Sequence, residues 1–203
     1  MLVRILVLVL GLMLPSVEAV QSNAYRAFAP MAAHDGEGLT FISVSAGGDH
    51  SCGVTSAGTL RCWGDNTDGQ STPPLGTFTT VSVGAYHSCA IRSDRRVNCW
   101  GSYSRLNVPA NDFTQISAGF SVTCGLRTDS TLACWGDNTF GSAAPPGGTF
   151  RSVSVGYYYA CAVTTDAKWL CWGDARPYEN YPTPSGDFTD VSTGNNHSCG
   201  LRL

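Results

Sequence analysis

"SCGVTSAGTLRCWGDN", residues 51–66, places two cysteines ten positions apart and follows the second with Trp-Gly. The phrase returns as "SCAIRSDRRVNCWGSY", "TCGLRTDSTLACWGDN" and "ACAVTTDAKWLCWGDA", and it begins a fifth time near Cys199. Each copy follows a segment F-x-x-[VI]-S-x-G, and these segments open 37, 35, 37 and 38 residues apart. The five segments open at Phe41, Phe78, Phe113, Phe150 and Phe188. A period near 37 with several short strands per unit indicates a propeller or a solenoid.

Each unit contains three readable β-strands, written in the second unit as "FTTVSVG", "HSCAIRS" and "RRVNCWG". A fourth strand is expected in the Pro-rich return that follows, as an edge or irregular strand because proline cannot donate to a ladder. Glycine and proline interrupt every 3.6-residue pattern, so no helix is expected in the repeats. These patterns predict an all-β fold of tandem antiparallel units, either a propeller or a solenoid.

One hairpin register satisfies all four complete repeats. With Cys52 opposite Cys62, Val54 faces Leu60 on the cysteine face, and every other repeat has an apolar pair in that row. A one-residue slip would turn these sets to the wrong faces. Cross-strand neighbours of this kind have Cα atoms about 4.5 Å apart, a separation that a disulfide accepts. The predicted disulfides are Cys52–Cys62, Cys89–Cys99, Cys124–Cys134 and Cys161–Cys171, with Cys199 as the unpaired thiol.

The amino-terminal residues predict export. Arg4 precedes an apolar run of ten residues that is too short to span a bilayer, and Val17 and Ala19 occupy positions −3 and −1 before a cleavage site. Residues 1–19 are therefore expected to be a signal peptide, and the mature chain is expected to be secreted or cell-surface, without membrane insertion. An oxidising compartment favours disulfides. The remaining expected parts are a partly disordered preface, 20–40, and propeller repeats over 41–203, divided into 41–77, 78–112, 113–149, 150–187 and a partial 188–203.

The repeated motifs resemble the repeats of the regulator of chromosome condensation family, on the strand ending "VSVG", the strand "HSCGV", the strand "LxCWGDN" and the following "DGQ". The paired cysteines resemble the secreted members of that family, and the extracellular repeats of crinkly-type plant receptor kinases are similar too. The resemblance implies the fold class that we predict, which is all-β with tandem four-stranded antiparallel blades of a β-propeller. Such blades are arranged around a central axis, and their number is normally seven. Residues 41–203 hold four complete units and part of a fifth. The alternatives are an open, incomplete propeller, which we favour, a four-bladed closure, or a truncated reading frame.

Composition and motifs argue against catalysis and cofactors. The net charge of −3 gives no basic stripe for nucleic acid. Of the four histidines, His34 precedes the repeats, while His50, His87 and His197 share one repeat position with Val122 and Tyr159, which indicates a packing slot. No nucleophile elbow or phosphate loop is present. We therefore expect no enzyme activity and no cofactor.

Metal binding and glycosylation have only weak signals. The cysteine spacing does not fit zinc, and "GDNTDGQ", residues 64–70, lacks the EF-hand spacing for calcium, so turn capping by Asp65 is the better interpretation. Asn196 begins one formal glycosylation sequon.

A binding surface is the functional hypothesis. In an antiparallel meander the first and third connections of each unit emerge at one end, and here they carry aromatic residues beside Asp49, Arg105 and Arg176. The predicted face consists of Tyr86, Tyr103, Phe120, Phe140, Tyr157, Tyr158, Tyr178 and Tyr181. Aromatic residues with arginine are typical of protein-binding hot spots. We expect a non-catalytic module that recognises a protein or glycan, with self-association through open blade edges or Cys199; the alternative is a structural surface protein or a nonfunctional propeller fragment.

Overall fold

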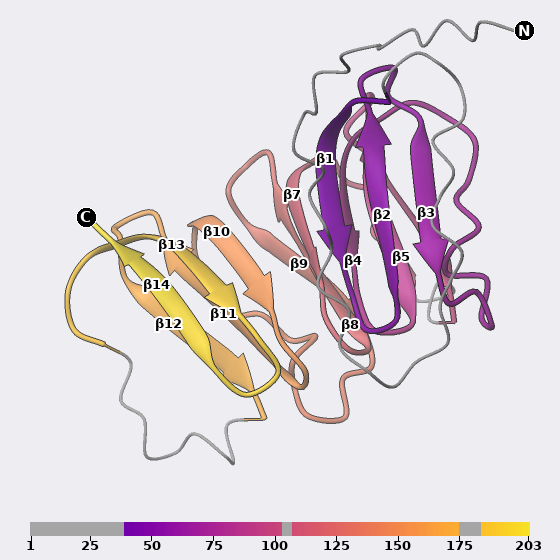
Figure 1. Cartoon of the computed structure of the whole chain (residues 1–203). Helices are drawn as coiled ribbons and strands as arrows, with labels where there is room; N and C mark the ends of the chain where they lie inside the picture. The colour runs from indigo at the N-terminus through magenta and orange to yellow at the C-terminus, as the bar shows by residue number, and fades with distance from the viewer. Residues whose placement is uncertain (1–38, 103–106, 175–183) are drawn as a thin grey trace, which may run out of the picture. The chain divides into compact units, whose positions relative to one another are not determined.

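The structure is a computed structural model that describes residues 39–102, 107–174 and 184–203 (Figure 1). The predicted signal peptide and nearly all of the preface lie outside the described residues. The described residues belong to one compact unit, and they contain fourteen β-strands in five antiparallel sheets. We call the sheets blades 1 to 5, in chain order. All the secondary structure described is β, which confirms the predicted class.

The strands of each blade are adjacent in sequence and in space. Blade 1 contains β1 (Phe41–Ala46), β2 (His50–Thr55) and β3 (Leu60–Gly64). Blade 2 contains β4 (Phe78–Val83), β5 (His87–Arg92) and β6 (Val97–Gly101). Blade 3 contains β7 (Phe113–Ala118), β8 (Val122–Arg127) and β9 (Leu132–Gly136). Blade 4 contains β10 (Phe150–Val155), β11 (Tyr159–Thr164) and β12 (Trp169–Gly173). Blade 5 contains β13 (Phe188–Thr193) and β14 (Ser198–Arg202).

The number of strands per blade differs from the expectation. Blades 1 to 4 have three hydrogen-bonded strands rather than four among the described residues. The two return segments that are described in full, 65–77 and 137–149, contain turns and bends but no strand. Each contains two consecutive prolines, which lack the N–H group that a ladder requires. The fourth strand predicted there is therefore wrong.

The hairpin register follows the expected rows. In blade 1, Cys52 lies opposite Cys62, Val54 opposite Leu60 and Ser51 opposite Trp63, and blades 2, 3 and 4 repeat the arrangement. The first strand of every blade also contains a bulge directly after its phenylalanine, such as the shift between Phe41 and Ser43. The bulge adds one residue to the first strand and increases its local twist.

Each complete blade contains one disulfide between its second and third strands. The bonded pairs are Cys52–Cys62, Cys89–Cys99, Cys124–Cys134 and Cys161–Cys171. Their Cα atoms lie 4.0–4.1 Å apart, the close spacing of directly opposed antiparallel residues. Cys199 is a free, exposed thiol in β14.

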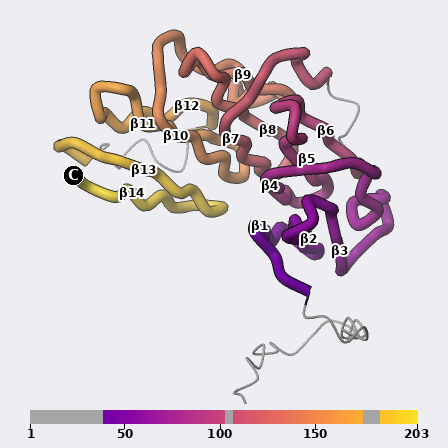
Figure 2. The backbone as a smooth tube through the Cα atoms, turned by 90° about the horizontal axis from the view of Figure 1, so that it is seen from above, coloured from indigo at the N-terminus to yellow at the C-terminus, as the bar shows by residue number. Residues whose placement is uncertain are grey.

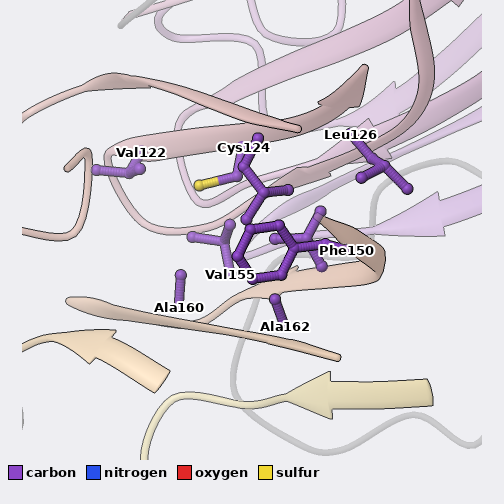
Figure 3. Packing of buried hydrophobic residues seen from close by; sticks show 9 residues of the cluster. Val122, Cys124, Leu126, Phe150, Val155, Ala160 and Ala162 are labelled. Atoms are coloured by element: carbon purple, nitrogen blue, oxygen red, sulfur yellow. The ribbon is translucent and has the colours of Figure 1, made fainter. Parts of the chain in front are cut away.

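The hydrophobic core lies between consecutive blades. Each blade has a back face, which carries the disulfide and faces the following blade, and a front face, which carries the phenylalanine of its first strand. Figure 3 shows the junction of blades 3 and 4, where Phe150 and Val155 of the front face lie against Cys124 of the back face. Equivalent clusters fill the other three junctions. Because each blade is one sheet thick, its burial depends on its neighbours.

The two terminal faces of the series are exposed. Val44, on the front face of blade 1, is 67% exposed, whereas its equivalent Val81 in blade 2 is 5% exposed. At the other end, Leu201 on the back face of blade 5 is 66% exposed, whereas its equivalent Val163 is fully buried. Figure 2 follows the backbone through the blades in chain order. The series is an open, incomplete propeller, as expected.

Candidate functional site

The first and third connections of each blade meet at one end, as the meander topology requires. Their backbones are joined by hydrogen bonds in all four complete blades: Asp65 N donates to Asp49 O at 2.8 Å in blade 1, and Asp174 N donates to Tyr158 O at 2.9 Å in blade 4. Blades 2 and 3 contain the corresponding bonds. We call this end the loop end, and the opposite end, where the second connections lie, the turn end.

Five of the eight predicted aromatic residues are described, and they form one continuous row across blades 2, 3 and 4. We call the row of Tyr86, Phe120, Phe140, Tyr157 and Tyr158 the aromatic row. The Tyr86 ring lies 5.2 Å from that of Phe120, centroid to centroid, and Phe120 lies 4.0 Å from Tyr157. Tyr158 lies 4.5 Å from Phe140, which comes from the third connection of the preceding blade. The rings therefore join connections that are distant in sequence.

The aromatic row is neither core nor fully exposed. Tyr86 is 38% exposed, and the other four side chains are partly buried, largely against one another. None of the five belongs to the buried clusters at the blade junctions. The remaining predicted residues, Tyr103, Tyr178 and Tyr181, lie outside the described residues, as do Arg105 and Arg176.

A pocket of about 600 Å³ lies beside the aromatic row, lined by the first connections of all five blades. Tyr86, Phe120 and Tyr157 contribute to its wall, and Asp49 is the one lining residue with a carboxylate. Much of the remaining wall is glycine and alanine backbone. The pocket therefore offers carbonyl groups, aromatic edges and one negative charge to a ligand.

Glycines bring the first connections together. A Cβ on Gly84 would lie 2.3 Å from the carbonyl oxygen of Gly119, and one on Gly119 would lie 2.2 Å from that of Gly156, so neither position accepts a side chain. This close approach allows Ala85 N to donate to Gly119 O at 3.1 Å and Phe120 N to donate to Gly156 O at 3.3 Å. The glycine of the F-x-x-[VI]-S-x-G motif is thus a requirement of blade-to-blade contact.

The serine of the same motif joins neighbouring first strands. Val83 N donates to Ser45 Oγ at 3.0 Å, and Ala118 N donates to Ser82 Oγ at 2.9 Å. Ser117 and Ser154 accept the corresponding bonds from blades 4 and 5. We call this series the serine ladder. The sequence pattern contained the signal, a serine at one fixed position, but only the structure shows its acceptor role across blades.

The histidine position is a packing slot. His50 Nε2 lies 2.8 Å from Ser88 Oγ of blade 2, and His87 Nε2 lies 2.7 Å from Thr123 Oγ1 of blade 3. Burial lowers the pKa of His87 to about 4, with a smaller lowering from His50, and burial also lowers the pKa of His50. Both side chains are therefore neutral at pH 7. His197 is exposed in blade 5, and His34 lies outside the described residues.

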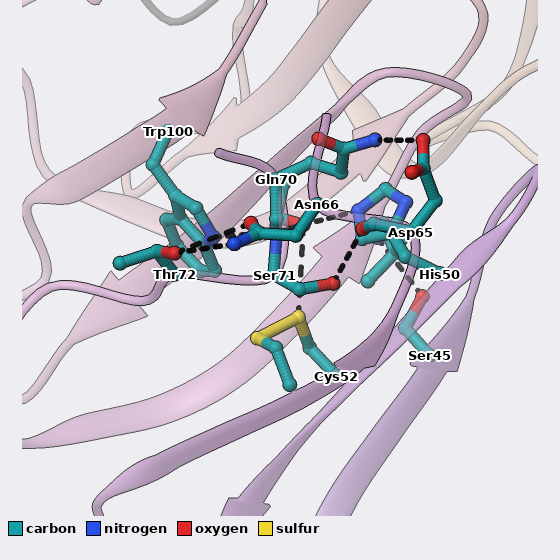
Figure 4. Close-up of a disulfide and its surroundings, with 12 residues drawn as sticks. Ser45, His50, Cys52, Asp65, Asn66, Gln70, Ser71, Thr72 and Trp100 are labelled. Atoms are coloured by element: carbon teal, nitrogen blue, oxygen red, sulfur yellow. Dashed lines mark hydrogen bonds between the residues drawn. A yellow bond between two sulfur atoms is a disulfide. The ribbon is translucent and has the colours of Figure 1, made fainter. Parts of the chain in front are cut away.

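The segment "GDNTDGQ" forms a turn that is held by its own side chains. Gln70 Nε2 donates to Asp65 Oδ2 at 2.7 Å, and Thr67 N donates to Asp65 Oδ1 at 3.2 Å. The Gln70 carbonyl accepts the indole N–H of Trp100 from blade 2 at 2.8 Å (Figure 4). Hydrogen bonds from Thr67 lower the pKa of Asp65. These bonds explain the acidic turn by capping, and no cluster of potential metal ligands occurs among the described residues.

The loop end and the turn end differ in charge. The described part of the loop end carries carboxylates, among them Asp49, Asp65 and Asp137. The described arginine and lysine residues lie on segments near the turn end, as with Arg92, which pairs with Phe78 at the start of β4, and Lys168. The aromatic row is therefore flanked by negative charge among the described residues.

Comparison with known proteins identifies the repeats. The fold and its junctions define a propeller-type repeat protein, and residues 41–70, 78–104 and 113–142 match the family model described as the regulator of chromosome condensation (RCC1) repeat. These three stretches of the chain thus match RCC1-type repeats, and each of the four complete units contains a disulfide. A search of curated protein sequences found no match.

Solved structures of similar fold include two plant receptor ectodomains. The CRINKLY WD40 ectodomain of the receptor kinase ACR4 from Arabidopsis thaliana has 29% identity and a TM-score of 0.68, covering 84% of this chain and 62% of its own. The ectodomain of the receptor kinase CR4 from Physcomitrella patens has 27% identity and a TM-score of 0.66, covering 79% of this chain and 47% of its own.

A yeast protein shares the fold at lower identity. Prp20p from Saccharomyces cerevisiae, whose structure is described with its binding to Gsp1p and histones, has 16% identity and a TM-score of 0.69, covering 81% of this chain and 57% of its own. The chain therefore spans between about half and three fifths of the length of these structures. In the part of the chain that the structure describes, no helix has the length and apolar character needed to cross a membrane.

Proposed function

We propose that this chain is an exported, non-catalytic binding module that recognises a protein partner through the aromatic row at its loop end. The observation that carries the proposal is the row itself: five aromatic side chains from three blades touch one another beside a pocket of about 600 Å³. RCC1-type propellers are typical protein-binding modules, which supports the general class.

The aromatic row has the composition of a binding hot spot. Tyrosine and tryptophan dominate such sites because they bury large areas with little loss of conformational entropy. The blade junctions are filled by other residues, such as Phe113 and Trp135, so the row is not needed to complete the core. Mutual packing of the rings also fixes their positions before a partner arrives, which reduces the cost of binding.

Charge favours a partner surface that is basic or neutral. Asp49 lies in the pocket, and the acidic turns at Asp65 and Asp137 lie at the same end. Complementary charges accelerate encounter and exclude partners of the same sign. A basic peptide segment or protein surface therefore fits the described residues of this end better than an acidic one.

Export is supported by the disulfides and by the relatives. Four disulfides are typical of an oxidising compartment, and the two plant proteins similar to this chain are ectodomains. The signal-peptide pattern of residues 1–19 is consistent with this. Intact-mass analysis of secreted protein should give a chain beginning at Val20.

The test is partner capture with matched variants. Mature chain immobilised as bait should capture a protein from the medium or surface of the producing cell, and the double variant Tyr157→Ala/Tyr158→Ala should lose it. Each hot-spot tyrosine should contribute about 2 kcal/mol or more to binding. Arg96→Ala, at the turn end, is the control and should bind as the unmodified chain does.

Two results would contradict the proposal. Retention of the partner by both the double variant and Tyr86→Ala would show that the row is not the binding surface. A glycan array on which the unmodified chain binds and the double variant does not, with no protein captured, would replace the protein partner by a carbohydrate. Thermal unfolding of each variant separates loss of binding from loss of fold.

A further inference from the structure

Asp49 differs from the two acidic turns that share the loop end with it. Asp65 and Asp137 each accept hydrogen bonds from residues of the turn that follows them. The side chain of Asp49 makes no hydrogen bond or salt bridge within the part of the chain that the structure describes. Asp49 is exposed, and it lines the pocket. Its carboxylate can therefore bind a ligand, whereas those of Asp65 and Asp137 are already engaged in capping their turns.

Small residues line the pocket beside Asp49. Gly48 and Ala85 follow the motif glycine in the first connections of blades 1 and 2, whereas the equivalent residues of blades 3 and 4 are aromatic. A Cβ on Gly48 would lie 3.2 Å from the carbonyl oxygen of Ala85, so the two connections are in contact. Asp49 and Tyr86 come directly after these small residues, and both line the pocket. A carboxylate and an aromatic ring thus border one corner of the pocket, built by two complete blades.

This corner fits an organic cation better than an anion or a metal ion. No lysine, arginine or histidine occurs among the described residues that line the pocket, so an anion would meet only Asp49. The carbonyl oxygens of Gly84, Gly119 and Gly156 each already accept a backbone N–H from the preceding blade. One carboxylate with these carbonyls falls short of the six to eight oxygen ligands, roughly, that calcium takes. Aromatic rings, in contrast, attract organic cations through their faces.

We propose that the pocket receives an arginine side chain of the protein partner, with its guanidinium group bound by the Asp49 carboxylate and stacked on the ring of Tyr86. This inference rests on the proposed function, because it names what the partner presents to the loop end. Arginine fits better than lysine, since a planar guanidinium donates two parallel hydrogen bonds to a carboxylate and also stacks on an aromatic ring. A pocket of about 600 Å³ also has room for the partner residues on either side of the arginine, beside Phe120 and Tyr157.

The pocket walls strengthen this contact. Ion pairs on an open surface are screened by water and salt, and they change affinity little. Here Gly48, Ala85 and the ring of Tyr86 form walls beside the charge, and the attraction between a guanidinium group and a ring increases as water is excluded. Hydrogen bonds from a charged donor to a carboxylate are also about twice as strong as those between neutral groups. Loss of the charge at Asp49 should therefore weaken the binding of arginine about tenfold or more.

The test presents peptides to the full mature chain. The probe is an array of random nonapeptides, each made in four versions that differ only at the central residue, which is arginine, citrulline, lysine or glutamate. Citrulline has the shape of arginine without its charge. The arginine version should bind most tightly, about tenfold or more above the citrulline version, followed by lysine and then glutamate. Fluorescence polarisation of the best set measures these ratios at about 150 mM salt, where charges farther than about 8 Å are largely screened.

Variants of the two corner residues separate charge from stacking. Asp49→Asn should abolish the preference for arginine over citrulline, and Asp49→Arg should reverse the preference towards the glutamate version, which a merely structural role of Asp49 would not produce. Tyr86→Leu keeps an apolar side chain without a ring, so it should reduce the preference for arginine over lysine. The control is Asp68→Asn, which removes the same charge from an exposed loop-end residue outside the pocket and should leave all these ratios unchanged.

The outcomes distinguish this inference from the proposed function. If Asp49→Asn keeps the captured protein while Tyr157→Ala/Tyr158→Ala loses it, the aromatic row is the binding surface and the arginine inference is wrong. If both variants and Tyr86→Ala keep the protein, the proposed function is wrong as well. The inference is also overturned if arginine peptides bind no better than their citrulline versions, or if Asp68→Asn removes the preference as Asp49→Asn does. Thermal unfolding of each variant should show that the fold is retained.

Discussion

The junction of blades 2 and 3 and the junction of blades 3 and 4 use different chemistry at one equivalent position. In the first, His87 bonds to Thr123 at 2.7 Å; in the second, Val122 packs in the same cluster as Ala160. A polar side chain is thus matched by a hydroxyl on the next blade, and an apolar one by a methyl group. The two junctions show that the repeat preserves a matched pair rather than a residue type, because a buried polar atom without a partner is costly.

Lowering the pH should destabilise the junction that contains His87 but not the junction that contains Val122, and this is the largest effect that we expect. His87 has a pKa of about 4 in the folded chain and about 6.5 when unfolded, so the unfolded chain binds the proton more readily. Its contribution to stability is therefore present above pH 6.5 and is lost as the pH falls towards 4, by about 3 kcal/mol in all. His50 should add a loss of the same sign.

Denaturant unfolding at several pH values between 7.5 and 4 measures this effect. The control is His87→Val/Thr123→Ala, which installs the pair of the next junction and removes the titrating group. Subtracting one profile from the other removes the pH dependence contributed by the carboxylates that both chains share. Parallel profiles for the two chains would show that His87 does not titrate with unfolding and would contradict the assignment.

The second prediction removes one member of the polar pair. Thr123→Val keeps the shape but leaves the His87 side chain, 2% exposed, without this hydroxyl, and should destabilise the chain by about 1–3 kcal/mol. His87→Val/Thr123→Ala should recover part of the stability lost in Thr123→Val. Its free energy of unfolding should be about 1 kcal/mol below that of the unmodified chain, because the two new side chains fill less volume.

Chemical denaturation at pH 7.5 compares these variants. Thr128→Val, at an exposed position of blade 3, is the control and should be close to neutral. If the double variant were less stable than Thr123→Val, the matched-pair interpretation of the two junctions would be wrong.

The same comparison explains what could be predicted from the sequence. Rows within one hairpin could be aligned, because Cys52, Val54 and Trp63 each lie within fifteen residues of their partners and obey a strict alternation. Partners across blades, such as His87 and Thr123, are 36 residues apart, and no alternation rule relates them. The histidine position could be recognised as a packing slot because it also held Val122 and Tyr159.

The serine ladder and the bulge in the first strand could not be predicted, because the sequence pattern has a simpler explanation at both places. The serine of the ladder lies two residues before a glycine, where turn preference already explains it. The bulge after Phe41 adds one residue without changing the composition of the strand. At the loop end the aromatic composition could be predicted, but the ring contacts depend on how neighbouring blades approach, as with Phe140 and Tyr158.

The third prediction concerns what the two junctions share, and its expected effect is the smallest. Ser82 accepts a bond from Ala118 N across the first junction, and Ser117 accepts one from Val155 N across the second, both at 2.9 Å. Replacing either serine by alanine leaves a partly buried N–H without that acceptor and should cost about 1 kcal/mol. Because the ladder is the same at both junctions, Ser82→Ala and Ser117→Ala should be equally destabilising, within about 0.5 kcal/mol. Ser192→Ala, at the exposed equivalent in blade 5, should be neutral in the same denaturation experiment. A clear difference between the two junctions here would mean that their inner strands are not equivalent, and the contrast between His87 and Val122 could then no longer be assigned to the paired side chains alone.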